Sequence, residues 1–289
     1  MMQKHVTIPW KGHHLAATIH YPTERADLGK NTCYPLVVIC HGFIGNRVGV
    51  NRLFFKAAQE LAEDRYVVIR FDYAGCGESD GDYGQNGWDD LIDQTNDVID
   101  FGLKWKGVDA SRLILLGHSL GGAVASWVAA NDPRVKKLIL WAPVGQPYKD
   151  IVSIVGAEEV EKLKRETFID YMGYQLTAHF FHSLSLYHPL EEASRFQGDV
   201  LILHGTNDED IPAEYCLHYA SAFQTREKGT CKKLLITGAN HTFSSWSSQK
   251  RLFTETRRWL ETVMTGETRK KLSNRSFGMF PADFRIQEM

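Results

Sequence analysis

The chain has 289 residues, of which 43% are hydrophobic and 24% charged, and its formal net charge is -2. This composition is typical of a globular protein, and it lacks the basic footprint of nucleic-acid-binding proteins. No apolar run approaches the ~20 residues of a bilayer-spanning helix and the N-terminus has no signal-peptide stretch, so we expect a cytoplasmic protein with no membrane partner.

The cysteines and histidines give no sign of a metal centre. The five cysteines are odd in number and irregularly spaced, which favours reduced thiols in a reducing compartment. His13-His14 and the pair His179 and His182 have the spacing of metal ligands, but neither has an evident third ligand. We therefore expect no metal and no cofactor.

The first elements are predicted to form an antiparallel hairpin at a sheet edge, because two alternating runs, 6–10 and 14–21, flank Lys11-Gly12-His13. Short apolar runs then alternate with amphipathic segments. Continuous hydrophobicity is typical of strands buried on both faces, and strand–helix alternation indicates a parallel sheet covered by helices on both faces. We expect these strands at 36–40, 67–71, 113–116, 138–141, 200–203 and 233–237, and helices at 53–61, 88–103, 123–130 and in a stretch reaching Trp259.

One connection is far longer than a usual strand–helix–strand link, with about 55 residues between two strands. This segment, 144–198, contains a charged helix pattern and then an aromatic-rich stretch. We expect it to be a cap inserted over the carboxyl edge of the sheet, where open α/β sheets bind ligands. The core is then 1–143 with 199–264, and the polar tail 265–289 is expected to be an arm or partly disordered.

The most informative stretch is Gly117-His118-Ser119-Leu120-Gly121, which lies between a predicted strand and a small-residue helix. In that context the Gly-x-Ser-x-Gly pattern indicates a nucleophile elbow. The turn is so sharp that side chains two residues before and after the serine would collide, and the two glycines remove them. The alternative is a serine in an ordinary Gly-rich turn. We interpret Ser119 as the nucleophile, at a helix N-terminus that favours negative charge.

A serine nucleophile needs a base, and the base needs an orienting acid, in the chain order Ser, Asp or Glu, His for this topology. Asp208 follows the next-to-last strand and is the predicted acid, with Asp210 as the runner-up. These acids and Glu209 could instead cap the next helix. His241 follows the last strand and is the predicted base, although a lone loop histidine is more often plain surface.

Two backbone N–H groups are predicted to form the oxyanion hole. One belongs to Leu120, directly after the nucleophile, and the other to Phe43 in the loop after an early strand. Gly42 lets that loop approach closely. A second Gly-rich loop, 75–81, lacks the Lys-Ser/Thr ending of a phosphate loop and is interpreted as a structural turn, with Cys76 as a remote alternative nucleophile.

These residues resemble the α/β-hydrolase superfamily over roughly 34–259. Four motifs agree in order: His41-Gly42-Phe43, the run 70–81, Gly117 to Gly122, and Asp208 with Pro212 followed by His241. The resemblance implies a serine hydrolase with a mostly parallel eight-stranded sheet, helices on both faces and an inserted cap. Within the superfamily the chain is most similar to the bacterial cinnamoyl/feruloyl esterase group, through Gly45-Asn46, the cap's length and position, and Tyr171-Met172-Gly173-Tyr174. The loop at Cys76 departs from the Gly-His-Gly common there.

We therefore expect a serine carboxylic-ester hydrolase that acts through an acyl-enzyme on hydroxycinnamoyl or other small aryl or short-chain esters. A peptidase, amidase or thioesterase with the same triad stays open, and so does a non-catalytic ligand receptor. Most aromatic rings of the cap are expected to form its own core, and the rest suit a flat acyl group. The expected partner is a small-molecule ester, and a homodimer is left open.

Overall fold

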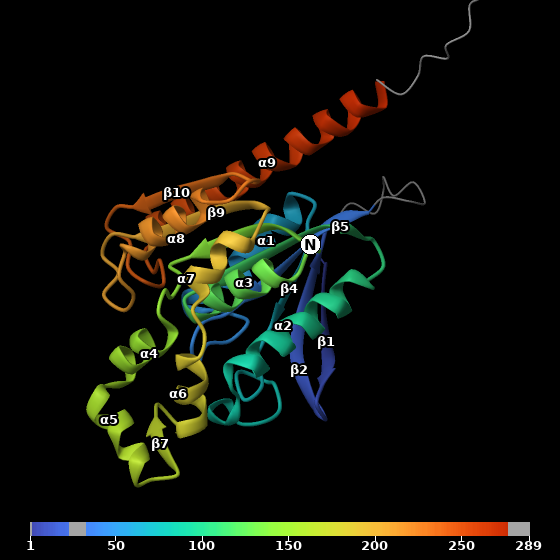
Figure 1. Cartoon of the computed structure of the whole chain (residues 1–289). Helices are drawn as coiled ribbons and strands as arrows, with labels where there is room; N and C mark the ends of the chain where they lie inside the picture. The colour runs from blue at the N-terminus through green and yellow to red at the C-terminus, as the bar shows by residue number, and fades with distance from the viewer. Residues whose placement is uncertain (1, 23–32, 277–289) are drawn as a thin grey trace, which may run out of the picture.

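The computed structural model describes residues 2–22 and 33–276, with side chains through Thr265, and its main feature is an eight-stranded sheet (Figure 1). The strand order is β1-β2-β4-β3-β5-β6-β9-β10. The strands are β1 (Met2–Trp10), β2 (His13–Tyr21), β3 (Tyr34–Cys40), β4 (Val67–Phe71), β5 (Val108–His118), β6 (Val135–Trp141), β9 (Asp199–Gly205) and β10 (Cys231–Ile236). β2 pairs antiparallel with β1 and with β4, and the remaining pairs are parallel. The predicted edge hairpin is confirmed.

Helices cover both faces of the sheet, as predicted. Alternate residues of β3 belong to different cores: Val37 and Ile39 share one with α1 and α9, whereas Leu36 and Val38 share the other with α2, α3 and α8. Successive strand side chains point to opposite faces, so a strand buried on both sides must be apolar throughout. The helices are α1 (Leu53–Glu63), α2 (Trp88–Leu103), α3 (Leu120–Asn131), α8 (Tyr215–Gln224) and α9 (Trp246–Ser276), with 3₁₀ turns η1 (Val50–Arg52) and η2 (Tyr83–Gln85).

Several elements extend beyond their predicted limits. β5 begins at Val108 rather than at residue 113. The prediction missed its first part because polar residues there, such as the half-buried Asp109 and the exposed Ser111, interrupt the apolar run. The helix expected at 123–130 begins at Leu120, directly after the candidate nucleophile. Only Ser119 therefore lies between β5 and α3.

The long insertion between β6 and β9 contains a two-stranded sheet and several short helices. These are α4 (Pro147–Val155), α5 (Ala157–Glu161), η3 (Lys162–Lys164), β7 (Phe168–Tyr171), β8 (Tyr174–Thr177), α6 (Ala178–Ser185), α7 (Pro189–Glu192) and η4 (Ala193–Arg195). Figure 1 shows α4, α5, β7 and α6 grouped together on the opposite side of the molecule from α9. The Thr177 hydroxyl donates to the Gly84 carbonyl over 2.6 Å, and the Ser183 hydroxyl accepts the Trp88 N–H over 2.9 Å, so the insertion is bonded to the core. Its last two elements, α7 and η4, pack against α3.

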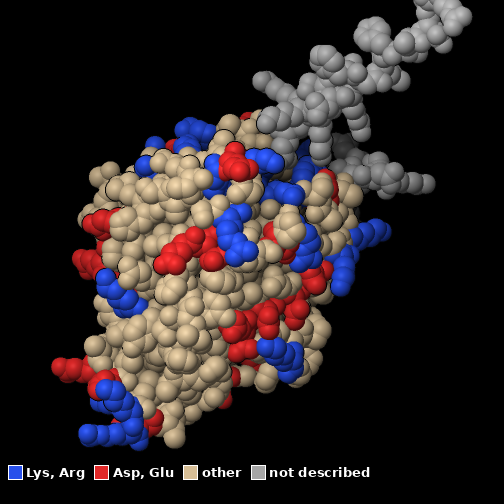
Figure 2. All heavy atoms as spheres, viewed as in Figure 1, with Lys and Arg blue, Asp and Glu red and all other residues tan. Residues whose placement is uncertain are grey.

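The tail predicted to begin at residue 265 starts as a continuation of α9, which reaches Ser276 and projects from the body in Figure 1. The sequence over 266–276 has no apolar period, but Glu, Lys and Arg are good helix formers without one. Residues 277–289 of the predicted tail lie outside the described residues. Every helix within 2–22 and 33–276 is too short or too polar to cross a bilayer. Acidic and basic side chains are interspersed over the face drawn in Figure 2.

Candidate active site

The predicted nucleophile lies in a strained turn between β5 and α3. Ser119 has φ 58° and ψ -127°, a left-handed conformation that a non-glycine residue adopts only where its surroundings enforce it. Its N–H donates to the Trp141 carbonyl over 3.0 Å, and its carbonyl accepts the Gly122 N–H over 2.9 Å. The backbone of the turn is thus held from β6 and from its own helix.

The two glycines of the motif are required by different neighbours. A Cβ on Gly117 would lie 2.2 Å from the Gly121 carbonyl oxygen, which is the crowding inside the turn that the sequence predicted. A Cβ on Gly121 would instead lie 2.2 Å from the His41 carbonyl oxygen, at the end of β3. The second glycine is therefore needed for close contact between α3 and the neighbouring strand, which the motif alone did not indicate.

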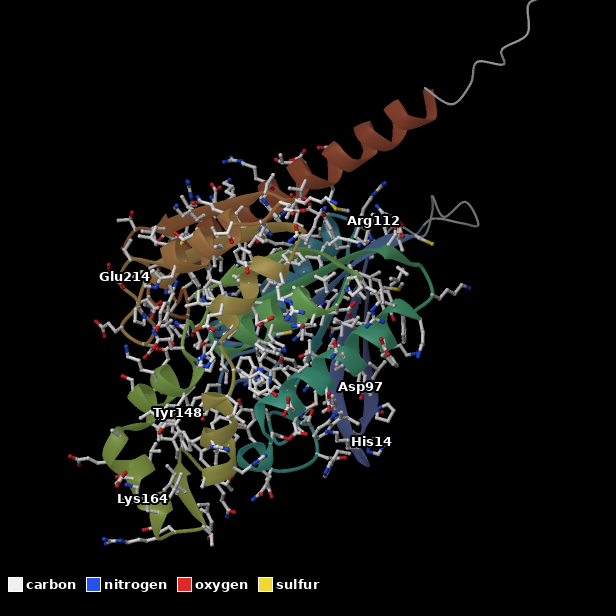
Figure 3. The ribbon with its side chains drawn as sticks, in the orientation of Figure 1. His14, Asp97, Arg112, Tyr148, Lys164 and Glu214 are labelled. Carbon is white, nitrogen blue, oxygen red and sulfur yellow. The ribbon has the colours of Figure 1, made fainter. Side chains whose placement is uncertain are left out.

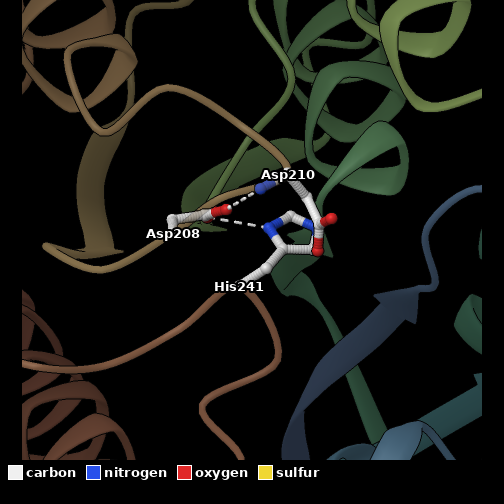
Figure 4. Close-up of side chains that lie close together, drawn as sticks. All are labelled: Asp208, Asp210 and His241. Atoms are coloured by element: carbon white, nitrogen blue, oxygen red, sulfur yellow. Dashed lines mark hydrogen bonds and ion pairs between the residues drawn. The ribbon is translucent and has the colours of Figure 1, made fainter.

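His241 and Asp208 are hydrogen-bonded to each other. The Nδ1–H of His241 donates to Oδ2 of Asp208 over 2.8 Å, and the Asp208 side chain is fully buried (Figure 4). This bond fixes the tautomer in which the Nε2 atom of His241 is free to accept a proton. The exposed Asp210 places a carboxylate oxygen within 4.8 Å of this pair, but no hydrogen bond between it and His241 occurs within 2–22 and 33–276.

Three further groups hold the Asp208 carboxylate. Nε2–H of the buried His204 donates to Oδ2 over 3.0 Å, and the N–H groups of Asp210 and Ile211 donate to Oδ1 over 3.0 and 2.8 Å. Burial alone would raise the pKa of Asp208, but the hydrogen bonds from His204 and His241 outweigh it and hold that pKa well below its usual range. The carboxylate therefore stays ionised beside the imidazole. The role of His204 was not predicted; its signal in the sequence is a polar residue near the end of a buried strand, four positions before the acid.

His118 connects His241 to the turn that carries Ser119. Its Nε2–H donates to the backbone carbonyl of His241 over 2.9 Å, and the two rings lie 4.7 Å apart between centroids. Burial lowers the pKa of His118 to about 3, helped by the neighbouring His241, so its ring is neutral. The residue before Ser119 is thus in direct contact with His241. Among the described residues no hydrogen bond joins the Ser119 hydroxyl to His241; such bonds are often long in the free enzyme and tighten with substrate.

The loop after β3 lies against Ser119 and is held by His41. Nε2 of this buried histidine accepts the Tyr73 N–H over 3.0 Å, and its Nδ1–H donates to the Gly42 carbonyl over 2.8 Å. A Cβ on Gly42 would lie 2.8 Å from the Ser119 Cβ, so the loop passes close to Ser119. Phe43 comes next, and its N–H meets no protein acceptor in the part of the chain that the structure describes. The Leu120 N–H is the first of α3 and has no acceptor inside the helix. Both amides are therefore available to a ligand.

Gly42→Ala is expected to lower ester turnover by about 10²–10³-fold, the cost of one displaced oxyanion donor. The added methyl forces the loop away from Ser119 and takes the Phe43 N–H with it. Phe43→Ala is the matched control, because it keeps that N–H; it should retain more activity on an acetyl ester. Steady-state kinetics of both variants measure this, and full turnover by Gly42→Ala would show that the loop supplies no donor.

Aromatic rings from the core and the insertion meet at Phe43, in the loop after β3. The Phe43 ring lies 6.0 Å from Tyr83 and 5.8 Å from both Tyr171 and Phe180, between centroids. Phe180 and Phe181 are buried, as expected for rings that form the insertion's own core, whereas Tyr171 and Tyr174 are partly exposed. The partly exposed rings are the ones that a substrate could contact.

The remaining candidates of the sequence do not join this group. Cys76 is buried, and burial raises the pKa of its thiol far above its usual range, so it is not a thiolate nucleophile. His14 bonds the exposed Asp80 over 3.1 Å. The group Asp208, Asp210 and His241 has a spacing that could hold a metal ion, but two of its members, Asp208 and His241, already bond each other.

Residues 34–263 match the family model described as serine aminopeptidase, S33. An uncharacterized 31.7 kDa protein from the traX-finO intergenic region of Escherichia coli is 40% identical over 114 residues, which are 38% of this chain and 37% of that protein. The uncharacterized peptidase YuxL of Bacillus subtilis is 24% identical over 227 residues, which cover 76% of this chain and 32% of YuxL. The chain thus spans 37% and 32% of the lengths of these two relatives.

Among solved structures, Est1E from Butyrivibrio proteoclasticus with ferulic acid bound is similar, with a TM-score of 0.76 and 21% sequence identity. The match covers 90% of this chain and 99% of Est1E. At this identity the likeness concerns the fold, and it confirms the predicted architecture of a mostly parallel sheet between two layers of helices.

Proposed function

The chain belongs to the serine aminopeptidase S33 family of α/β hydrolases, and from this premise we propose that it hydrolyses carboxylic esters through an acyl-enzyme on Ser119. The observation that supports the proposal most is the bonded pair of Asp208 and His241, held by His118 against the strained turn that carries the serine. A serine nucleophile, an oriented base and free backbone donors are the parts that acyl transfer needs.

The proposed reaction has two halves. The Ser119 hydroxyl attacks the ester carbonyl while Nε2 of His241 takes its proton, and Asp208 stabilises the imidazolium that forms. The N–H groups of Phe43 and Leu120 stabilise the tetrahedral oxyanion. The imidazolium then protonates the departing alcohol. Water, activated by the same base, attacks the acyl-enzyme and releases the acid.

We further propose that the acyl group is a flat aromatic acid of the hydroxycinnamoyl type, or else another small aryl or short-chain acid. Phe43 and the partly exposed Tyr171 support this, because aromatic rings favour stacked and edge contacts with a flat group. Est1E, whose structure holds ferulic acid, supports it by similarity of fold. A panel of aryl, short-chain and long-chain esters tests the proposal, and a preference for long acyl chains would contradict it.

The family's description favours one other candidate, hydrolysis of an amide bond by the same three side chains. Parallel assays with a 4-nitrophenyl ester and the 4-nitroanilide of the same acid separate the two. Ester turnover without anilide turnover supports the esterase. Efficient anilide turnover would favour a peptidase or amidase, and covalent labelling of Ser119 without turnover of either would favour a ligand receptor.

A further inference from the structure

A buried carboxylate bonds the segment through which the chain passes from β6 into the inserted cap. We call this segment, residues 144–146, the hinge. Asp150 lies in the first turn of α4 and is 5% exposed. Its Oδ2 accepts the N–H of Gln146 over 2.9 Å and the N–H of Gly145 over 3.2 Å. One side chain of the cap thus satisfies two backbone donors of the hinge.

The core contributes two tyrosine hydroxyls to the same place. Tyr215 O–H donates to Oδ1 of Asp150 over 2.8 Å, and Tyr219 O–H donates to the Val144 carbonyl over 2.8 Å. Burial raises the pKa of both tyrosines well above the usual value, so both stay protonated donors. Both lie on α8, the helix that follows the Asp208 loop. Figure 3 labels Tyr148 on α4 and Glu214 directly before α8, and so locates the two helices that the Asp150–Tyr215 hydrogen bond joins.

The hinge is also bonded to the nucleophile turn. The Val144 N–H donates to the Ser119 carbonyl over 3.0 Å. At the next residue the hinge touches α8, because a Cβ on Gly145 would lie 2.5 Å from the Tyr215 ring. The hinge therefore lies between the helix that follows the catalytic acid and the turn that carries the serine, with no room to shift toward Tyr215.

The position of α4 affects the residues beside the oxyanion loop. Tyr171 O–H donates to the Ile154 carbonyl of α4 over 3.4 Å, and the Tyr171 ring contacts Phe43. α4 also packs against α6, which carries Phe180. We expect an acyl group that is large enough to reach these rings to depend on the position of the cap. We expect an acetyl group to depend on it less, because it needs only Ser119 and the N–H groups of Phe43 and Leu120.

We propose that Asp150, Tyr215 and Tyr219 form a positioning clamp that fixes the cap over Ser119 and thereby sets the acceptance of large acyl groups. This inference rests on the proposed ester hydrolysis. Its physical basis is the cost of leaving buried polar groups without partners: with the clamp intact the hinge has one satisfied conformation. Without Tyr215 O–H, the buried carboxylate loses a donor and other hinge conformations compete.

The test compares 4-nitrophenyl cinnamate with 4-nitrophenyl acetate, which share a leaving group and differ in acyl size. Tyr215→Phe is expected to lower kcat/KM for the cinnamate by about 5- to 10-fold and for the acetate by less than about twofold. Asp150→Ala removes the acceptor of both hinge N–H groups. It should also lower kcat/KM more for the cinnamate than for the acetate, by a ratio at least as large as that of Tyr215→Phe. Asp150→Asn should restore the parent values, because its amide oxygen accepts the two N–H groups and its amide nitrogen donates to Tyr215.

Tyr187→Phe is the matched control. It removes another tyrosine hydroxyl that donates to an aspartate, Asp89 on α2, at an exposed contact away from the hinge. It should change neither ester by more than about twofold.

Equal losses on both esters in Tyr215→Phe would mean general destabilisation and would overturn the clamp, as would no loss on the cinnamate. If Asp150→Ala does not fold, Tyr215→Phe decides alone. A parent enzyme that hydrolyses only the acetate would also overturn it. If the parent hydrolyses neither ester, the proposed function fails together with the clamp. If the parent hydrolyses both esters and Tyr215→Phe affects them equally, only the clamp fails.

Discussion

Ser119→Ala is expected to lower ester turnover by about 10⁴–10⁶-fold, because no other described group in the site can form the acyl-enzyme. Cys76 is buried with a raised thiol pKa and cannot take over the role. The oxyanion amides remain in the variant, so a small residual rate above that in water should persist.

The measurement is steady-state hydrolysis of an aryl ester by parent and variant at equal concentration, with thermal unfolding as the control for folding. Alanine at a position with φ 58° carries backbone strain as serine does, so the two proteins should unfold at similar temperatures. An active, folded Ser119→Ala variant would reject the assignment of the nucleophile.

Asp208→Asn is expected to lower turnover on the order of 10³–10⁴-fold. The carboxylate holds His241 with its proton on Nδ1, and an amide in its place can donate to Nδ1 and select the wrong tautomer. The volume is unchanged, and the backbone donors at residues 210 and 211 keep an oxygen to bond. The loss should therefore appear in kcat with little change in KM.

Asp210→Asn is the matched variant, since this acid is the alternative that the sequence left open. Its side chain is exposed, and its backbone N–H, which bonds Asp208, is unaffected by the change. Turnover should stay within about threefold of the parent, because solvent screens an exposed charge. The reverse ranking, with Asp210→Asn inactive and Asp208→Asn active, would exchange the roles of the two acids.

Much of the fold could be predicted because the strands that carry the site are short continuous apolar runs. Each predicted site residue follows the carboxyl end of such a strand, as Ser119 follows β5 and His241 follows β10. In a parallel sheet those ends lie along one edge, so strand order alone brings the loops together. Local sequence also identified the sharp turn at Ser119, because the steric cause of Gly117 is confined to a few residues. The contact that requires Gly121, with the His41 carbonyl, is not local.

The contacts that hold the site could not be predicted in the same way. His118 bonds a carbonyl 123 residues away, and Tyr215 bonds an aspartate 65 residues away. His118 lies within the Gly-x-Ser-x-Gly motif, but at a position where the motif accepts any residue, and Tyr215 belongs to no motif. Their partners are set by packing of α4, α8 and the strand ends, which periodicity does not encode. The end of α9 was missed for a related reason: a helix without an apolar face leaves no period to detect.

Proton transfer from the Ser119 hydroxyl to His241 is the step on which the proposed mechanism depends most. The most direct test is fluorophosphonate labelling followed by peptide mass spectrometry, in the parent and in His241→Ala. We predict a single adduct, on Ser119, that forms about 10³-fold more slowly without the imidazole, the typical contribution of a positioned general base. An adduct on another residue, or an equal labelling rate in both proteins, would contradict the proposed activation of Ser119 by His241.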